Sequence, residues 1–428
     1  MTALGGAVQD FADAARRFSR PARLYLLSEF LVWTAYGIST VLFNLYLVEA
    51  GLPESFVGRA VSASALGLAL AALPAGALAD RWGRRRTLLL GALLEGAGQL
   101  ARAATVHPGA VLASGFVVGS GQAMFQIAAA PFLTDQSTAR ERTHLFSTFF
   151  ASALLAGVVG SAIGGGLPPL VHALAPRLPR FACYRAALLA GGVLAFAAAL
   201  PLLALRGVVE PRHGHDAPPP AADRRRLVPI ALNSALIGMG AGLVIPFMNL
   251  YFKDRFGCTS AQIGATFSVA QVSTAVAGLL GPALARRFGK LRTAVASELL
   301  SLPFLVTLGA ERRLGVAVGA FWLRASLMQA STPLLNAFVM EVLPPALRAR
   351  STSLNNLVWN LGWALSATTA GLVIERFGYA VPFYLTAALY ATAATTFFVA
   401  FRGVRERATE VRLSEEAKGL RGEGPSTE

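Results

Sequence analysis

The stretch GALADRWGRRRTLLLG, residues 76–91, joins the end of one apolar run to the start of another. Between the two runs stand one aspartate, Asp80, and four arginines. The whole chain has 428 residues, of which 54% are hydrophobic and 14% are charged. Because a soluble protein has about 25% charged residues, this burst of charge indicates a loop between two segments that cross a membrane.

Apolar runs of about 20 residues without charge are long enough to cross a bilayer, and residues 60–79 and 261–285 are two such runs. Lipid offers the backbone no hydrogen-bond partner, so a spanning segment is a helix or part of a closed barrel. These runs lack the polar–apolar alternation of barrel strands. We therefore predict an all-α membrane protein with twelve transmembrane helices, at residues 23–48, 57–79, 87–105, 109–134, 144–170, 184–205, 229–252, 261–284, 293–309, 314–341, 352–374 and 381–402.

The orientation of these helices follows from the basic residues. Most of the 38 Lys and Arg residues fall in the two tails and in alternate loops, so the positive-inside rule places both termini in the cytoplasm. Topology accounts for the net charge of +15 without a nucleic-acid partner. A cytoplasmic N-tail (1–22), a linker rich in proline and charge (206–228) and a disordered cytoplasmic C-tail (403–428) complete the predicted organisation.

The two halves of the chain resemble each other. FNLYLVEAGLPESFVG at 43–58 is similar to MNLYFKDRFGCTSAQIG at 248–264, and WGRRRT at 82–87 is similar to FGKLRT at 288–293. In the same register the second half matches Asp135 and Arg142 with Glu341 and Arg348. The repeat matches a basic loop of the first half with a basic loop of the second half, so both copies have the same orientation and each needs an even number of spans. With twelve spans, it predicts two pseudo-symmetric six-helix bundles, 23–205 and 229–402. A substrate site is expected between the bundles, near the middle of the membrane.

The opening stretch resembles the loop signature that follows the second span in the major facilitator superfamily. The matching residues are Gly76, Asp80, Arg81, Gly83, Arg84, Arg85 and Arg86. The second copy is degenerate, with Arg286 where Asp80 stands in the first. DQSTARERTHLFS, residues 135–147, is also similar to the family's loop after the fourth span. The resemblance implies a secondary transporter that works by alternating access in a bacterial cytoplasmic membrane, and not an enzyme.

The resemblance also implies a cytoplasmic gate, formed by Gly76, Asp80, Arg81, Gly83, Arg84, Arg85 and Asp135. Asp80 is expected to face the start of the eleventh span near Ser351, where the helix dipole favours a carboxylate. Arg84 is expected to pair with Asp135. The alternative is that the arginines only enforce topology. In the fifth span, GVVGSAIGGG at 157–166 is similar to an antiporter signature, but Ser161 replaces its proline, so close helix packing is the preferred interpretation.

Ionisable residues inside a span are candidates for function, because burying them in lipid is costly. The predicted spans contain four such residues: Glu29, Glu95, Glu298 and Arg324. The resemblance implies that the first, fourth, seventh and tenth spans line the cavity, which favours Glu29 and Arg324. The third and ninth spans are expected at the periphery, so Glu95 and Glu298 are weaker candidates.

The candidate substrate-binding residues are Arg324, Trp33, Tyr36, Gln122, Gln126, Trp322 and Gln329. Glu29, Trp33, Tyr36 and Thr40 share one helix face by their spacing. Arg324 is predicted to bind an anionic group through its forked guanidinium, while Glu29 carries a coupling proton or pairs with Arg324. A structural ion pair, or an arginine that reaches the membrane surface, is the alternative interpretation.

No metal site, cofactor or nucleotide site is expected: no histidine pair has metal spacing and no P-loop motif occurs. Cys183 and Cys258 are predicted to be free thiols. The sequence thus predicts a monomeric transporter of a small molecule, coupled to H⁺, with efflux of amphipathic solutes favoured. A transporter of a small organic anion bound by Arg324 is the first alternative. A transporter-like sensor or scaffold without net transport is the second.

Overall fold

The computed structural model describes residues 18–138, 141–205 and 226–404. These residues form helices joined by short turns, and no β-strand occurs among them. Most of the predicted N-tail, linker and C-tail falls outside the described residues. The helices are α2 Arg20–Glu49, α3 Glu54–Trp82, α4 Arg84–Ala104, α5 Pro108–Asp135, α6 Arg142–Leu174, α7 Arg180–Ala197, α8 Ala199–Leu203, α9 Leu227–Val244, η2 Ile245–Phe247, α10 Met248–Phe256, α11 Ser260–Phe288, α12 Lys290–Ala310, α13 Leu314–Val342, α14 Pro345–Phe377 and α15 Ala380–Phe401.

In the described ranges, twelve helical passes account for all twelve predicted spans, and two of the passes are interrupted. Among the described residues, ten segments are long and apolar enough to cross a membrane. The other two predicted passes are α4, which contains Glu95 and Arg102, and α13, which contains Arg324. The 21 residues of α4 rise about 31 Å, which matches the ~30 Å hydrocarbon core. Charge inside these two helices therefore lowers their hydropathy without shortening them.

The described residues divide into two compact units. Unit 1 contains residues 18–205, 241–272 and 360–382, and unit 2 contains 226–240, 273–359 and 383–404. This division differs from the predicted bundles at 23–205 and 229–402. The cause is that two segments of the second half, 241–272 and 360–382, pack against the first half through glycines and short polar side chains, as described below.

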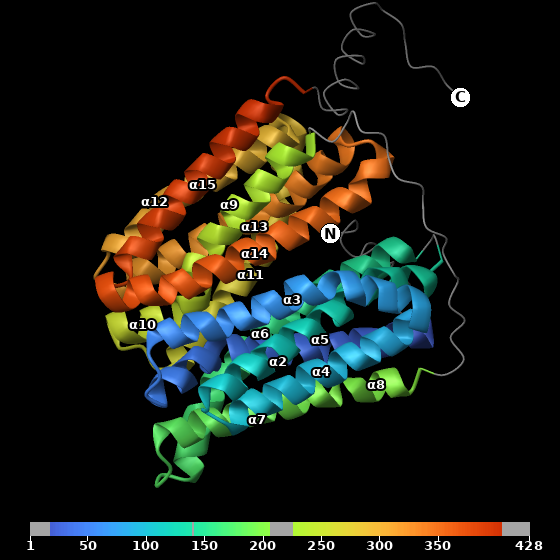
Figure 1. Ribbon diagram of the computed structural model, residues 1–428. Helices are drawn as coiled ribbons and strands as arrows, with labels where there is room; N and C mark the ends of the chain where they lie inside the picture. The colour runs from blue at the N-terminus through green and yellow to red at the C-terminus, as the bar shows by residue number, and fades with distance from the viewer. Residues whose placement is uncertain (1–17, 139–140, 206–225, 405–428) are drawn as a thin grey trace, which may run out of the picture. The chain divides into compact units, whose positions relative to one another are not determined.

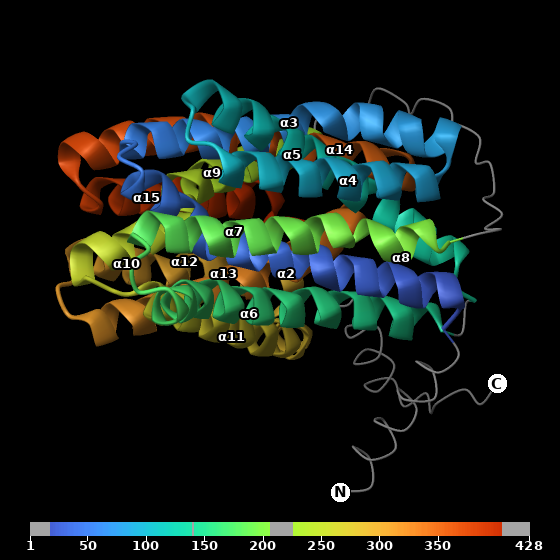
Figure 2. The ribbon, with the colours of Figure 1, turned by 90° about the horizontal axis from the view of Figure 1, so that it is seen from below.

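Unit 1 is built around α2–α8, which run side by side (Figure 1). The helix α2 packs against α6 and α7, and α5 packs against α3 and α4 (Figure 2). Aromatic rings fill the interior near the start of α2, where Tyr25 stacks on Phe125 with ring centroids 5.7 Å apart. Ser19 caps α2 by accepting a hydrogen bond from the backbone N–H of Ala22 at 3.3 Å, which fixes where this helix begins.

The predicted sixth and seventh spans are interrupted helices rather than continuous ones. The first interruption lies at Ala198, between α7 and α8, and its carbonyl accepts a hydrogen bond from Ser28 Oγ at 2.7 Å. The second is the 3₁₀ turn η2, which contains Pro246. Proline lacks an N–H and cannot continue the helical ladder. Other helices supply side chains that satisfy the freed carbonyls, as a membrane interior requires.

Unit 2 has its own apolar core at the start of α9 and the ends of α13 and α15. Phe338, Phe397 and Phe401 are each no more than 4% exposed and lie in one hydrophobic cluster. The Phe397 and Phe401 rings have centroids 4.8 Å apart. The helix α12 packs along α13. This core holds α13 in place, and with it Arg324.

Candidate functional site

A pocket in unit 1 brings together four of the predicted substrate-binding residues. The helices α2, α4 and α5 contribute its lining, which consists of Val32, Trp33, Tyr36, Glu95, Gln122, Phe125 and Gln126. The lining is thus mainly aromatic and apolar, with two amides and one carboxyl group. Binding sites for small molecules have this composition, in which a few polar groups orient an otherwise apolar ligand.

Of the predicted face of α2, only Trp33 and Tyr36 line this pocket. The Trp33 and Tyr36 rings meet edge to face with centroids 5.4 Å apart, and Tyr36 is 41% exposed. Glu29 is fully buried and does not line the pocket. Neither of its carboxylate oxygens has a hydrogen bond of normal length within the described residues, although Trp33, one turn along α2, is a donor within reach. Its proposed role as the proton carrier remains a prediction.

Glu95 belongs to the third predicted span, for which a peripheral position was expected. Its side chain lines the pocket and is 1% exposed. The cause is the close approach of α4 and α5, because a Cβ on Gly121 would lie only 2.5 Å from the backbone nitrogen of Glu95. Gln99 Nε2 donates to Glu95 Oε1 at 3.3 Å, whereas Oε2 has no hydrogen-bond partner in the described part of the chain.

Arg102 is a buried charge that was not among the candidates predicted from the sequence. It lies two turns after Glu95 on α4 and is 8% exposed. Its guanidinium donates to Ser39 Oγ and stands over the Phe43 ring, 4.3 Å from the centroid. Both partners belong to α2 and neither lines the pocket. They therefore hold the Arg102 guanidinium outside the pocket. The i, i+7 spacing from Glu95 was the signal in the sequence, because it places both side chains on one helix face.

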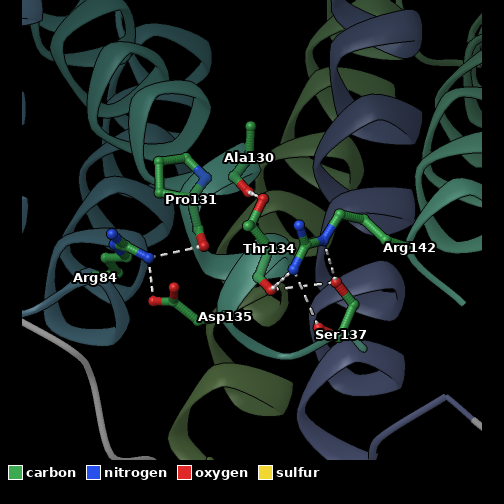
Figure 3. Close-up of polar contacts among 7 residues, drawn as sticks. All are labelled: Arg84, Ala130, Pro131, Thr134, Asp135, Ser137 and Arg142. Atoms are coloured by element: carbon green, nitrogen blue, oxygen red, sulfur yellow. Dashed lines mark hydrogen bonds and ion pairs between the residues drawn. The ribbon is translucent and has the colours of Figure 1, made fainter. Parts of the chain in front are cut away.

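In the basic loop, Arg84 forms an ion pair with Asp135 (Figure 3). The same guanidinium donates to the carbonyl oxygen of Pro131 at 2.8 Å. The repeat produces the same contact in unit 2, where Lys290 and Glu341 form an ion pair. Gly83 and Gly289 precede these basic residues with φ of 92° and 86°, a conformation that favours glycine. The pairing expected for Arg84 is therefore present, and it occurs twice.

The other predicted gate residues have different surroundings. Arg85 donates to the carbonyl oxygens of Leu202 and Leu203 at 3.5 and 3.2 Å. These hydrogen bonds satisfy two backbone carbonyl groups at the C-terminal end of α8. Asp80 and Arg81 are exposed, and a Cβ on Gly76 would meet no atom within 4 Å. Asp80 belongs to unit 1 and Ser351 to unit 2, so the expected contact between them remains a prediction.

Arg324 lies inside unit 2 and is 3% exposed. Its Nη2 is 3.5 Å from the Tyr390 hydroxyl of α15, a long hydrogen bond. Trp322 and Gln329 are about 140–160° away around α13 at 100° per residue, so they lie on a different side of that helix. Gln329 is exposed and Trp322 is half-buried. The structure thus does not place the three predicted binding residues of α13 on one face.

Glu298 is the buried carboxyl group of α12. It is 2% exposed and accepts a hydrogen bond from Ser331 Oγ of α13 at 3.4 Å. This contact joins α12 to α13 inside unit 2. Glu298 therefore has a structural partner on a neighbouring helix, and it does not line the pocket of unit 1.

The repeated Asn-Leu-Tyr motif forms a reciprocal contact within unit 1. Asn44 Nδ2 donates to the Pro246 carbonyl oxygen at 2.5 Å and to Asn249 Oδ1 at 3.3 Å. Asn249 Nδ2 donates to the carbonyl oxygens of Thr40 and Val41 at 3.2 and 3.0 Å. Each asparagine thus bonds the backbone of the other half of the repeat. The contact lies near the end of α2 opposite to Arg20.

Further contacts at this end of unit 1 use small residues. A Cβ on Gly165 of α6 would lie 2.9 Å from the Gly264 Cα of α11, and Ser260 Oγ donates to the Gly165 carbonyl at 3.1 Å. Ser62 Oγ of α3 donates to the Ala364 carbonyl of α14 at 2.5 Å. Cys183 and Cys258 are free, buried thiols of the same unit. No group of three or more His, Cys, Asp or Glu side chains in the described ranges is arranged to hold a metal ion.

The fold, the loop and the repeat define a class of protein, the helical membrane transporters built from two related halves. The family model of the Major Facilitator Superfamily matches residues 25–233 and again 230–425. The chain therefore belongs to the Major Facilitator Superfamily. The two matches follow the two halves of the repeat. Accordingly, the protein is a multi-pass membrane transporter of a small molecule, its transport is of the secondary type, and it is not an enzyme.

Relatives and solved structures agree with this assignment. The chain is 29% identical over 308 residues to an uncharacterized MFS-type transporter of Enterobacter sp. strain 638, which covers 71% of this chain and 75% of the relative. It is 26% identical over 284 residues to the uncharacterized MFS-type transporter YcaD of Salmonella typhimurium, which covers 64% and 69%.

Two solved structures have a similar fold. A bacterial homolog of the human lysosomal transporter Spinster has a TM-score of 0.72 at 17% identity, covering 90% of this chain and 96% of that protein. A D-xylose–proton symporter has a TM-score of 0.71 at 14% identity, covering 89% and 97%. At these identities the likeness establishes the fold alone.

Proposed function

We propose that the protein is a monomeric, proton-coupled transporter that exports amphipathic solutes across the bacterial cytoplasmic membrane by alternating access, with both termini in the cytoplasm. The single observation that carries this proposal is the pocket of unit 1. Its lining is mainly aromatic and apolar, and a buried carboxyl group stands among these side chains. An apolar surface with few polar groups fits an amphipathic ligand better than a highly polar one.

Proton coupling is supported by carboxyl groups placed inside spans. Glu29 and Glu95 are each no more than 1% exposed, and the described residues contain no ion pair for either. A buried carboxyl group without a counter-ion gains from carrying a proton or from binding a cation. Glu29 is the predicted coupling residue, and Glu95 is a second candidate close to the substrate.

Alternating access is supported by the contacts of Asn44 with Asn249 and of Gly165 with Gly264. They bring together elements of the two halves of the chain at one end of unit 1. These contacts consist of side-chain amides and glycine surfaces, which can separate without leaving a large apolar area exposed. The duplicated ion pairs at Arg84 and Lys290 lie within their own units, so they are suited to holding each half rigid during such a change.

The second candidate function is transport of a small organic anion. The observation that favours it is Arg324, whose Nε has no hydrogen-bond partner among the described residues. An unsatisfied guanidinium nitrogen fits a carboxylate or phosphate. The side chain is, however, enclosed within unit 2 beside Tyr390. A ligand would therefore have to displace neighbouring side chains to reach it.

Transport in vesicles tests the proposal. The purified protein is reconstituted in proteoliposomes, a pH gradient is imposed, and accumulation is measured for lipophilic cations, neutral amphipaths and organic anions. We expect the amphipaths to accumulate in the direction opposite to the proton flow, and not in vesicles without protein. If organic anions move instead, and Arg324→Ala abolishes that movement, the second candidate is correct. If ligands bind and none moves, the protein is a sensor and the proposal is wrong.

A further inference from the structure

We propose that Arg102 is the positioning residue that keeps the last turns of α2 on their own half of the chain when the contact with the second half opens. The inference rests on the proposed function, because it takes the opening and closing of that contact as part of alternating access. It gives a role in transport to a buried charge that lies outside the pocket.

The last turns of α2 present one face to α4. The Arg102 guanidinium donates to Ser39 Oγ and stands over the Phe43 ring, 4.3 Å from its centroid. About one turn further along α2, the Tyr46 hydroxyl donates to two backbone carbonyl oxygens at the end of α4, at 3.2 and 3.4 Å. Ser39, Phe43 and Tyr46 follow the spacing i, i+4, i+7, so they share one face of the helix. This face of α2 is therefore tied to α4, its neighbour in the first half of the chain.

Another face of the same turns contacts the second half of the chain. The Asn249 side chain donates to the carbonyl oxygens of Thr40 and Val41, and Asn44 donates to a carbonyl oxygen of η2. Thr40 and Asn44 lie about 100° and 140° around α2 from Ser39, at 100° per residue. The end of α2 is thus held between two groups of contacts. When the halves separate at this end, one group must break and the other must hold.

The two groups of contacts differ in strength. The asparagine contacts with the second half are hydrogen bonds between uncharged groups, whereas Arg102 donates from a charged group, and such bonds are stronger. The Phe43 ring adds the attraction of an aromatic face for a cation. Arg102 is 8% exposed. If α2 left α4, a guanidinium would remain inside a span without Ser39 and Phe43, which is costly.

One ion pair also joins α2 to the second half. Lys253 Nζ lies 3.3 Å from Glu49 Oε2, and the two side chains are 24% and 27% exposed. Ion pairs that water reaches contribute little to stability, because solvent screens the charges. The buried contact of Arg102 with α2 therefore outlasts the contacts between the halves.

The helix α4 is a firm support for α2, because other helices of the first half enclose its end. A Cβ on Gly98 would lie 2.8 Å from a side chain of α5, and a Cβ on Gly192 of α7 would lie 2.8 Å from the Leu100 side chain. Arg185 of α7 also donates to the last carbonyl oxygen of α4. Arg102 therefore transmits the position of the first half to the end of α2.

This arrangement has a defined consequence for transport. With Arg102 in place, opening at this end breaks the asparagine contacts, and α2 moves with α4. Without Arg102, the asparagine contacts keep α2 on α10, and the separation falls between α2 and α4 instead. The path between the halves then stays closed at this end. Turnover falls, whereas substrate binding is retained, because Arg102 does not line the pocket.

Spin labels test which neighbour α2 follows. The full-length protein without native cysteines is reconstituted in lipid nanodiscs. Ala50→Cys at the end of α2 is combined either with Ala104→Cys of α4 or with Arg255→Cys of α10, all half-buried or exposed positions, and electron resonance gives the distance of each pair. Asn249→Ala removes contacts with the second half, so it should lengthen the α2–α10 distance and leave the α2–α4 distance unchanged. Arg102→Met should lengthen the α2–α4 distance and leave the α2–α10 distance unchanged.

Three further variants assign the effect to the guanidinium. Arg102→Lys keeps a donor for Ser39 and a cation near Phe43, so it should behave like the unsubstituted protein. Ser39→Ala removes one partner and should give a smaller change of the same kind, which provides the measurement if Arg102→Met does not fold. Arg185→Met is the matched control, because this arginine donates to the same end of α4 and not to α2. Both distances should stay unchanged in it.

Transport in proteoliposomes gives a second readout, with tetraphenylphosphonium as the probe. Arg102→Met should lower the maximal rate at least about tenfold and leave KM within about twofold, since the residue acts on opening and not on binding. Arg102→Lys should restore the rate. Rates are compared only for variants that elute as a single species in size-exclusion chromatography.

Three results would overturn the inference. These are unchanged label distances in Arg102→Met, lengthening of both distances together, and the same change in Arg185→Met. The outcome also separates the two proposals. Transport of the probe by the unsubstituted protein, with no change of distance in Arg102→Met, contradicts this inference alone. The expected distance changes in a protein that moves no amphipath in vesicles contradict the proposed function alone.

Discussion

At the scale of single residues, the most informative pair is Asn44 and Asn249. The repeat relates them in sequence, and in the structure each bonds the backbone of the other half. The Pro246 carbonyl belongs to the interrupted seventh span, so it needs a donor from elsewhere. Asn44 supplies that donor, and the helix break and the contact between the repeats therefore depend on one side chain.

We predict that Asn44→Ala loosens this end of unit 1. The substitution removes the donor to the Pro246 carbonyl, and a lost buried hydrogen bond costs about 1–3 kcal/mol. Backbone amides of α10 should then exchange with deuterium about tenfold faster, as measured by mass spectrometry. Asn233→Ala is the matched control, because Asn233 is a buried asparagine of the same span whose Oδ1 has no partner among the described residues. Unchanged exchange in α10 would contradict the prediction.

Single residues also show how much of the candidate site could be predicted from the sequence. The spacing of Trp33 with Tyr36, and of Gln122 with Gln126, placed each pair on one helix face, because helical period fixes which side chains share a face, and the family resemblance implied that the two helices lie together. The sequence could not reveal that Glu95 joins them, since this depends on how closely two glycine-bearing helices approach. Nor could the sequence reveal that Arg324 forms a hydrogen bond with Tyr390. Tertiary packing, and not the spacing of residues along the chain, determines where an isolated charged side chain points.

At the scale of elements, glycines determine how closely helices of the two halves approach in unit 1. The helices α6 and α11 cross where Gly165 and Gly264 face each other, and a Cβ on Gly264 would lie 2.7 Å from the Gly165 Cα. Such an approach admits no side chain, so these two positions set the separation of the helices. Membrane helices commonly use small residues in this way.

We predict that Gly264→Ala separates α6 from α11 by about 1 Å, because the added Cβ would lie 2.4 Å from the Ser161 carbonyl oxygen, whereas ordinary contact begins at 3.4 Å. Spin labels on cysteines introduced by Leu174→Cys and Ala261→Cys, both exposed positions, report the distance by pulsed electron resonance in a background without native cysteines. The distance distribution should shift to longer values. Gly166→Ala should leave it unchanged, since a Cβ there would meet no atom within 4 Å. Identical distributions in both variants would show that these glycines do not set the separation.

We also predict that the two repeated ion pairs differ in their effect on stability. The Arg84 and Asp135 side chains are 14% and 9% exposed, whereas Lys290 and Glu341 are 23% and 30% exposed. Asp135→Asn should therefore lower the free energy of unfolding by about 1–3 kcal/mol, and Glu341→Gln by about 0–1 kcal/mol. Thermal unfolding in detergent measures both. A larger loss in Glu341→Gln would contradict the burial argument.

At the scale of the whole molecule, the sequence predicted the helices and the repeat because both leave a periodic pattern. Apolar segments predicted the passes and charge predicted the loops between them, although buried charges lower the hydropathy of α4 and α13. The division of the described residues into two units was not predicted. It arises because segments 241–272 and 360–382 make their contacts with the first half, and contacts between distant segments leave no local signal in one sequence.

The proposed function requires that substrate and proton move through the protein in opposite directions. Its most direct test records the pH inside proteoliposomes while an outward substrate gradient is imposed without any initial pH gradient, using tetraphenylphosphonium as the substrate and a membrane potential clamped at zero. The interior should become more acidic as the cation leaves, and Glu29→Gln vesicles should show no such change. Exit of the cation through the protein with a constant internal pH would contradict it.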